Sequence, residues 1–126
     1  MNKYVDVISL GQTYEGRDQK LLRIRRAGRG KPNVLIEAGT HAREWISISS
    51  CLYIIDRLVN QDDEDPEVQK FLRNLNFHIV PVVNPDGYEY SRRSDRLWRK
   101  SRSHNLNSDC RGVDTNRNWD HFWGCE

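Results

Sequence analysis

One stretch, residues 33–59, constrains the fold of this chain more than any other. It begins with a short apolar segment at 34–38, which predicts a buried strand, and Gly39 follows directly. After a short loop, apolar residues recur at three- and four-residue spacing through 45–59, which predicts a helix. A strand that leads through a loop into a helix is typical of layered α/β folds, so we predict that class.

Three further strands are predicted from short apolar or alternating segments. The first covers 5–10, and the second covers 21–26, where apolar and basic residues alternate as in an antiparallel or edge strand. A third strand is predicted at 77–83, with Pro81 marking an edge or an irregular end.

Capping and turn residues predict where the remaining elements begin and end. Asp65 and Pro66 are suited to cap and open a short helix that runs to about residue 72. The sequence Asn-Pro-Asp-Gly at 84–87 is a turn signal. Beyond residue 91 the chain is polar and rich in loop residues, and long loops of this kind often carry function.

Composition places the chain among ordinary globular domains. Its 126 residues are 37% hydrophobic and 30% charged, which suits one domain with a modest core. The formal net charge of +2 gives no reason to expect a nucleic-acid partner. No run of about 18 apolar residues is present, so no membrane span is predicted. Residues 1–6 also lack the charged-then-apolar pattern of a signal peptide.

The three cysteines leave the redox compartment open because their number is odd. Cys51 lies in the apolar helical segment and is predicted to be a buried free thiol. Cys110 and Cys125 flank a polar loop and can pair, but sequence spacing alone does not fix the connectivity.

His41 and Glu44 are the first candidates for chemistry. They lie between the strand at 34–38 and the helix at 45–59, a junction where α/β folds often place ligands. One imidazole and one carboxylate are two of the three protein ligands of a catalytic zinc site, with metal–ligand distances of about 2.0–2.2 Å. A lone His-x-x-Glu pair is also frequent by chance, in which case both side chains are merely solvated.

Three further motifs accompany this pair. They are Asn-Pro-Asp-Gly-Tyr at 84–88, Arg-Leu-Trp-Arg-Lys-Ser-Arg at 96–102 and Cys-Arg-Gly-Val-Asp-Thr-Asn-Arg-Asn-Trp at 110–119. Together with His-Ala-Arg-Glu-Trp at 41–45, their order and spacing resemble the signature blocks of the zinc metallocarboxypeptidases, and more closely the pancreatic-type A and B subfamily. The resemblance extends from about residue 8 to residue 120.

The resemblance implies a fold, a cofactor and a location. We expect a partial three-layer α/β/α fold with a mixed sheet, truncated at both ends relative to the family domain. Residues 1–126 would be the N-terminal portion of a single catalytic domain. The implied cofactor is Zn²⁺, and the complete protein is expected to be extracellular.

The resemblance also assigns metal and substrate roles. His41 and Glu44 match the first two zinc ligands, and Asp114 matches a carboxylate that orients His41. Such a carboxylate commonly accepts the second N–H of a zinc-bound histidine.

Four further positions match residues that bind the substrate, a peptide or protein C-terminus. Arg43 matches a residue that holds the substrate near the scissile bond. Arg99 matches the catalytic arginine that polarises the scissile carbonyl and stabilises its oxyanion, as a fixed positive charge can do. Asn116 and Arg117 match the pair that binds the terminal carboxylate, which a guanidinium can bind through two parallel hydrogen bonds.

The family's third zinc ligand and its catalytic glutamate fall beyond residue 126. None of the other histidines, His78, His104 and His121, matches a family ligand. The expected function is zinc-dependent hydrolysis of the C-terminal peptide bond. This chain by itself is predicted to be inactive and to expose apolar sheet edges that promote aggregation.

Three other interpretations remain open. A catalytically inactive, carboxypeptidase-like binding module is possible because the residues usually lost in such relatives would lie outside this chain. A nucleic-acid-binding domain is suggested by six basic residues around Trp98 in 91–102, although the small net charge argues against it. The third is a metal-free structural domain. The residue that separates A-type from B-type side-chain preference also falls outside the chain.

Overall fold

The computed structural model describes residues 3–61, 64–121 and 123 of the chain. In chain order its elements are β1 (Lys3–Gln12), β2 (Asp18–Arg26), β3 (Asn33–Glu37), α1 (Trp45–Asn60), α2 (Pro66–Asn74), β4 (Asn76–Val80), α3 (Pro85–Arg93) and the short 3-10 helix η1 (Thr115–Arg117).

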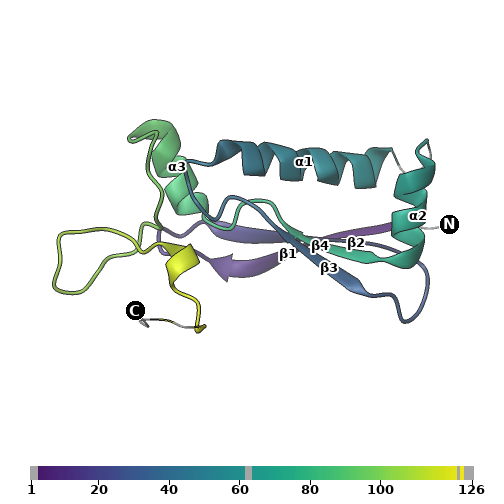
Figure 1. Cartoon of the computed structure of the whole chain (residues 1–126), viewed down its shortest axis with the longest axis horizontal. Coiled ribbons are helices and arrows are strands. Elements are labelled where there is room, and N and C mark those ends of the chain that lie inside the picture. Colours follow the sequence, from purple (N-terminus) through teal and green to yellow (C-terminus); the bar gives the residue numbers. More distant parts are fainter. Residues whose placement is uncertain (1–2, 62–63, 122, 124–126) are drawn as a thin grey trace.

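The strands of this described part form a single mixed sheet in the order β1–β2–β4–β3. β2 pairs antiparallel with β1 on one side and with β4 on the other, while β3 and β4 are parallel. Parallel neighbours need a crossover connection, and α1 and α2 provide it over one face of the sheet (Figure 1). The prediction of an α/β fold with a mixed sheet is confirmed.

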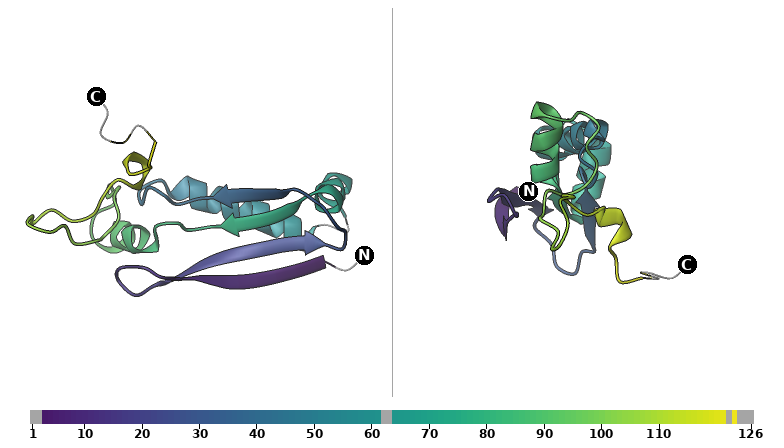
Figure 2. Two further views of the ribbon diagram at one scale, coloured as in Figure 1. Left: turned by 90° about the horizontal axis from the view of Figure 1, so that it is seen from below. Right: turned by 90° about the vertical axis from the view of Figure 1, so that its left-hand side faces the viewer.

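The α-helices of the described residues lie on one face of the sheet, as the view from below makes clear (Figure 2). The described part of the chain therefore contains the sheet and one helical layer of the expected three-layer arrangement. α3, the loop after it and η1 gather at the end of the sheet where β3 and β4 finish (Figure 1). None of the helices among the described residues is both long enough and apolar enough to cross a membrane.

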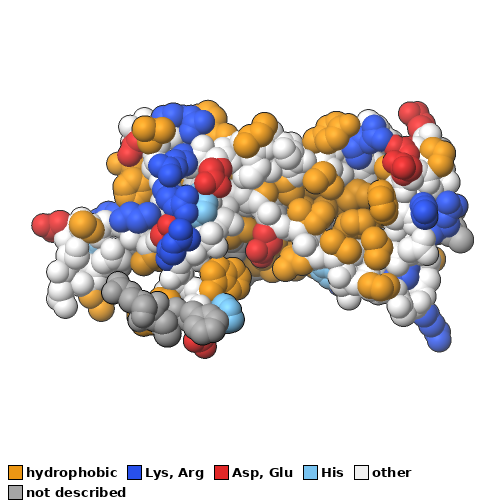
Figure 3. Space-filling view, in the orientation of Figure 1, with side chains coloured by type: hydrophobic (Ala, Val, Ile, Leu, Met, Phe, Trp, Pro, Cys, Tyr) orange, Lys and Arg blue, Asp and Glu red, His pale blue; other side chains and the backbone are white. Residues whose placement is uncertain are grey.

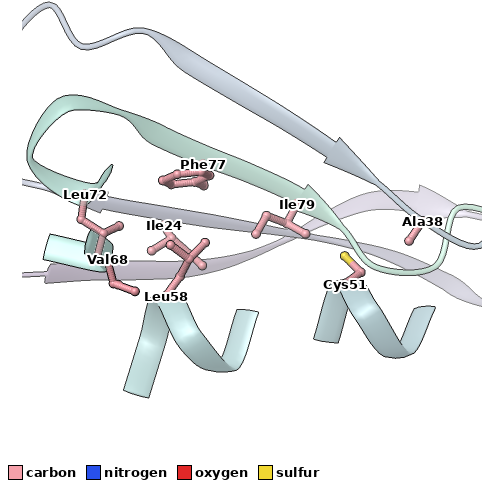
Figure 4. Close-up of a cluster of buried hydrophobic side chains, with 8 residues drawn as sticks. All are labelled: Ile24, Ala38, Cys51, Leu58, Val68, Leu72, Phe77 and Ile79. Carbon is pink, nitrogen blue, oxygen red and sulfur yellow. The ribbon is translucent and has the colours of Figure 1, made fainter. Parts of the chain in front are cut away.

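The core lies between the sheet and the helices α1 and α2 (Figure 4). Its buried side chains come from β2, β4, the residue after β3 and two helices, namely Ile24, Ala38, Cys51, Leu58, Val68, Leu72, Phe77 and Ile79. Cys51 is a free cysteine with 2% of its surface exposed, as predicted. Burial raises the pKa of its thiol. Cys110 is a free, exposed cysteine, and Cys125, with which the sequence allowed it to pair, lies outside the described residues.

Two helices begin at an Asx–Pro pair. Asp65 accepts hydrogen bonds from the backbone N–H groups of Glu67 (2.8 Å) and Val68 (3.4 Å), which starts α2 as predicted. Asn84 accepts one from the N–H of Gly87 at 2.9 Å and starts α3. The prediction of a turn at 84–87 is therefore wrong. Proline stabilises a helix at its first position because its missing N–H would have no partner there.

The strand predicted at 21–26 as antiparallel or at an edge is antiparallel, because β2 pairs in that direction with both of its neighbours. The strand predicted at 77–83 needs correction. β4 ends at Val80 instead of residue 83, because Pro81 has no N–H to donate to a neighbouring strand.

A largely apolar groove lies between α1, α2 and the sheet, and it appears as the broad hydrophobic area in Figure 3. Its volume is about 350 Å³, and Tyr53 and Phe71 line it with 62% and 50% of their surfaces exposed. Leu35 of the edge strand β3 is also exposed. The expected exposed apolar surface is therefore present, and the aggregation predicted from it remains to be measured.

Candidate functional site

The candidate site lies in the loop between β3 and α1, at the carboxyl end of the parallel strand pair. Residues 38–44 form this loop, and two hydrogen bonds to the Ser47 side chain fix its course. The N–H of Gly39 donates to Ser47 Oγ at 3.1 Å, and Ser47 Oγ donates to the carbonyl of Glu44 at 2.7 Å. The loop is thereby closed against the first turn of α1.

His41 and Glu44 direct their side chains toward each other from this loop. His41 Nδ1 and Glu44 Oε1 are 3.0 Å apart, and the histidine side chain is 11% exposed against 48% for the glutamate. Two ligands at about 2.0–2.1 Å around a tetrahedral zinc ion would lie about 3.3 Å apart. The donor atoms of this pair therefore fit two adjacent positions around such an ion.

Asp114 lies on the opposite side of the His41 ring. Its Oδ1 is 3.3 Å from His41 Nε2, an ion-pair distance rather than a well-aligned hydrogen bond. A carboxylate on this side favours the proton on Nε2 and leaves Nδ1 free to act as a ligand.

The same carboxylate binds two other candidate residues. Arg99 Nε donates to Asp114 Oδ2 at 2.8 Å, and the backbone N–H of Asn116 donates to Oδ1 at 3.0 Å. The Arg99 hydrogen bond holds the pKa of the Asp114 carboxyl below its ordinary value, against the opposing effect of burial. Asp114 is therefore anionic at neutral pH and connects three parts of the site.

Arg99 completes the contact with the metal-ligand loop. Its Nη1 atom lies 3.5 Å from Glu44 Oε1, and its carbonyl oxygen accepts a hydrogen bond from the N–H of Ala42 at 3.1 Å. The guanidinium is therefore held next to the His41–Glu44 pair by both side-chain and backbone contacts.

A short antiparallel contact brings Asp114 to this position. The N–H of Ser101 donates to the carbonyl of Val113 at 3.0 Å, and the N–H of Gly112 donates to that of Ser103 at 2.8 Å. Gly112 has a φ of +75°, and a Cβ there would overlap the Ser101 carbonyl oxygen. Only glycine allows both features, so this residue sets the approach of the two segments.

The remaining candidates are placed less closely. Asn116 lines a cavity of about 280 Å³ together with His41 and Glu44. Arg117 is exposed, and its guanidinium donates to the carbonyl of Asn116 at 3.0 Å. Arg43 is exposed as well. Within the described part of the chain, the side chains of Arg43 and Arg117 form no hydrogen bond or ion pair with His41, Glu44, Arg99 or Asp114.

A complete ligand set is not found among the residues that the structure describes. No group of three or more His, Cys, Asp or Glu side chains is placed to hold a metal ion there. Among the described residues, His78, His104 and His121 do not join His41 and Glu44 in such a group.

Sequence reasoning missed the residues that anchor the loop from α3 and the segment after it. Ser91 Oγ lies 3.1 Å from the carbonyl oxygen of Ala42 and accepts a hydrogen bond from Trp45 Nε1 at 2.9 Å. Arg96 donates to the carbonyl of Arg43 at 2.8 Å and stacks over the Trp45 ring at 3.8 Å. The motif at 96–102 begins with Arg96, so the sequence pointed to this residue, but no role was assigned to it.

Several basic side chains of 91–102 have partners inside the protein. The Arg102 guanidinium lies 3.7 Å from the Tyr90 ring centroid and 4.6 Å from that of Trp98, and Arg99 binds Asp114. Side chains used in this way are less available to a phosphate backbone, which weakens the nucleic-acid interpretation.

Known proteins resemble this chain over nearly its whole length. A family profile described as zinc carboxypeptidase matches residues 2–126. Carboxypeptidase A6 of Homo sapiens is 44% identical over 119 residues, which cover 94% of this chain and 27% of that protein. Carboxypeptidase B of Astacus astacus is 43% identical over 118 residues, which cover 93% of this chain and 38% of that protein.

Solved structures give the same result. The crystal structure of thrombin-activatable fibrinolysis inhibitor superposes with a TM-score of 0.92 at 36% identity, over 95% of this chain and 30% of that one. Carboxypeptidase A from Helicoverpa armigera gives a TM-score of 0.86 at 37% identity, over 96% of this chain and 30% of that one. The chain thus spans between 27% and 38% of the length of the two curated relatives above. Because sequence and structure match over nearly its whole length, this chain belongs to the zinc carboxypeptidase family.

Proposed function

We propose that this chain is the N-terminal portion of a zinc carboxypeptidase catalytic domain, and that it supplies two zinc ligands and half of the residues that bind the substrate. The observation that carries the proposal is the 3.0 Å approach of His41 Nδ1 to Glu44 Oε1, with Arg99 and Asp114 in contact with the same pair. In the complete protein these residues would serve to hydrolyse the C-terminal peptide bond of peptides or proteins.

In this proposal His41 Nδ1 and Glu44 hold the metal, and Asp114 keeps the His41 ring in the required orientation. Bound zinc lowers the pKa of a coordinated water toward about 7, which supplies a nucleophile at neutral pH. The half-exposed Glu44 side chain leaves the pair accessible to substrate.

Arg99 is the proposed oxyanion-stabilising residue. Asp114 binds Nε of its guanidinium, and the Nη1 atom lies 3.5 Å from Glu44 Oε1. A positive charge fixed in this way, before the reaction starts, can stabilise the negative charge that develops on the scissile carbonyl oxygen.

Asn116, Arg117 and Arg43 are the proposed substrate-binding residues. Asn116 lines the cavity that also contains His41 and Glu44, and Arg117 is adjacent to it in the chain. The exposed guanidinium of Arg117 can bind a terminal carboxylate through two parallel hydrogen bonds. Arg43 would hold the substrate near the scissile bond.

Catalysis requires more than these residues supply. A catalytic zinc site has three protein ligands and a water, and the reaction also needs a general base. We propose that the third ligand and the base lie outside these 126 residues. The 126-residue chain should then release no C-terminal amino acid above background, and chelator-sensitive release by the pure chain would contradict this.

Peptide binding tests the proposed specificity directly. A peptide with a free C-terminal carboxylate should bind the zinc-supplemented chain at least about tenfold more tightly than the same peptide with a C-terminal amide. The amide has no negative charge, so it loses the charge-assisted hydrogen bonds to the Arg117 guanidinium. Arg117→Ala should abolish this preference, while Arg111→Ala, an exposed arginine nearby, should retain it. Equal binding of acid and amide by the unmodified chain would contradict the proposal.

An inactive binding module would show the same preference for the free carboxylate. It would differ in the complete protein, which would bind peptides without hydrolysing them. An extracellular location for the complete protein likewise remains a prediction from the family resemblance.

A further inference from the structure

Asn84 is a buried amide whose side chain bonds to three separate segments. It is 6% exposed and lies in the motif at 84–88, which contains none of the residues assigned to zinc or substrate. Its Nδ2 group donates to the carbonyls of Thr40 (3.3 Å) and Lys100 (3.0 Å), while its Oδ1 accepts from the N–H of Gly87 (2.9 Å). Both amide protons and the carbonyl oxygen are therefore used.

Two of these partners stand next to site residues. Thr40 directly precedes His41, and Lys100 directly follows Arg99. The backbone N–H of Asn84 adds a bond to the carbonyl of Gly39 at 3.1 Å. One side chain thus connects the loop that carries the metal-ligand pair to the segment that carries the oxyanion-stabilising arginine.

Gly87 provides an independent observation that this contact is tight. A Cβ at Gly87 would lie 2.6 Å from the Lys100 carbonyl oxygen and 2.5 Å from Asn84 Nδ2. The Lys100 contact is made by its backbone carbonyl, which cannot rotate away as a side chain could. The absence of a side chain at Gly87 is what lets α3 approach closely enough for Asn84 to reach both carbonyls.

We propose that Asn84 is a positioning residue that fixes the separation between the His41–Glu44 loop and Arg99. A fully bonded buried amide holds a unique arrangement because any shift would leave a polar group unpaired in a buried place. The importance of this separation for zinc chemistry rests on the proposed function, whereas the separation itself is a property of the fold.

Two variants separate positioning from helix capping. Asn84→Asp and Asn84→Ser both keep an oxygen that can accept from Gly87, and both residues are favoured helix caps. In Asn84→Asp the side chain has no N–H to donate to the carbonyls of Thr40 and Lys100. In Asn84→Ser the side chain is too short to reach both of these carbonyls. Asp86→Asn is the matched control, because Asp86 is also buried in the first turn of α3 but binds Thr13, Glu15 and Arg17 in the β1–β2 hairpin.

The backbone amide of Ala42 reports the separation between the His41–Glu44 loop and Arg99. Ala42 is fully buried, and its N–H donates a hydrogen bond from this loop to the Arg99 carbonyl. Hydrogen exchange of the ¹⁵N-labelled chain should be measured by NMR at Ala42 and, as a reference for global opening, at Ile79 in the core. Both Asn84 variants should raise the Ala42 rate relative to Ile79 at least about tenfold, and Asp86→Asn should leave this ratio unchanged.

An unchanged ratio in the Asn84 variants, whether both rates rise together or neither does, would overturn the proposal. The same change of ratio in Asp86→Asn would also overturn it, since the effect would then belong to α3 as a whole. The measurement needs no zinc, so its failure is distinguishable from failure of the proposed function, which the peptide and metal binding experiments test separately.

Discussion

Arg99 donates a hydrogen bond from Nε to Asp114 Oδ2 at 2.8 Å, and the other oxygen of this carboxylate faces His41 Nε2 at 3.3 Å. The proposed oxyanion-stabilising arginine and the proposed zinc ligand therefore share one anchor. A change at Asp114 should disturb both, although Asp114 itself touches neither metal nor substrate in the proposed site.

Asp114→Asn should weaken zinc binding by about tenfold or more, the usual cost of losing a hydrogen-bond partner of a metal-bound histidine. Competition with a chromophoric chelator measures the affinity. Asp109→Asn, which changes an exposed carboxylate of the preceding loop, is the matched control and should bind zinc as the unmodified chain does. Equal affinities for all three proteins would show that Asp114 does not support His41.

Asp86 should make stability depend on acidic pH. Burial alone would raise the pKa of its carboxyl, but hydrogen bonds from Thr13, the Glu15 amide and Arg17 outweigh burial and hold that pKa below the ordinary 3.8. The stabilisation is therefore complete above this ordinary value and is lost as the pH falls through the lower, folded-state pKa.

Urea unfolding of the chain and of Asp86→Asn measures this contribution. The free energies of unfolding should differ by about 1–3 kcal/mol near neutral pH, the usual cost of removing one partner of a charged, buried hydrogen bond. The difference should begin to shrink only near about pH 4, where the carboxyl of the unfolded chain starts to be protonated, and it should be lost through the lower pKa of the folded state. A difference that grows on acidification would contradict the assigned direction of the pKa shift.

The two described cysteines should differ in reactivity. Cys51 is buried with a raised thiol pKa, so little reactive thiolate forms, whereas Cys110 is exposed. Under reducing conditions, alkylation read out by peptide mass spectrometry should modify Cys110 at once and Cys51 only on unfolding. Rapid modification of Cys51 in the folded chain would show that the core around it opens readily.

The apolar groove should cause the chain to self-associate. Phe71→Lys places a charge on its exposed wall and should shift the sedimentation velocity profile toward monomer. Leu97→Lys is the control, because Leu97 is 71% exposed but does not line the groove. A monomeric, cooperatively melting unmodified chain would contradict the aggregation expected from this surface.

The sequence predicted most elements because their determinants are local. Asp65 and Pro66 began α2 as expected, and the apolar spacing in 45–59 identified α1. The same Asx–Pro signature at Asn84 and Pro85 was interpreted as a turn because Gly87 follows, yet it starts α3. The glycine proved to serve close packing against the Lys100 carbonyl, which depends on tertiary structure and leaves no local signal.

The site was predictable only where side-chain type carries the chemistry. His41 and Glu44 were identified from their residue types and spacing, Arg99 and Asp114 from the family resemblance, and the structure brings all four into contact. Asn84 was not assigned a role because its partners are the backbone carbonyls of Thr40 and Lys100. Every residue has such a carbonyl, so the pairing becomes visible only once the chain is folded.

Zinc uptake in equilibrium dialysis tests the central claim most directly, because the claim is that His41 and Glu44 form part of a zinc site. The unmodified chain should bind zinc, and His78→Ala, which changes the histidine of β4, should bind it equally well. His41→Ala should bind it at least about tenfold more weakly, since a direct ligand matters no less than its supporting partners. Equal zinc uptake by His41→Ala and the unmodified chain would contradict the account.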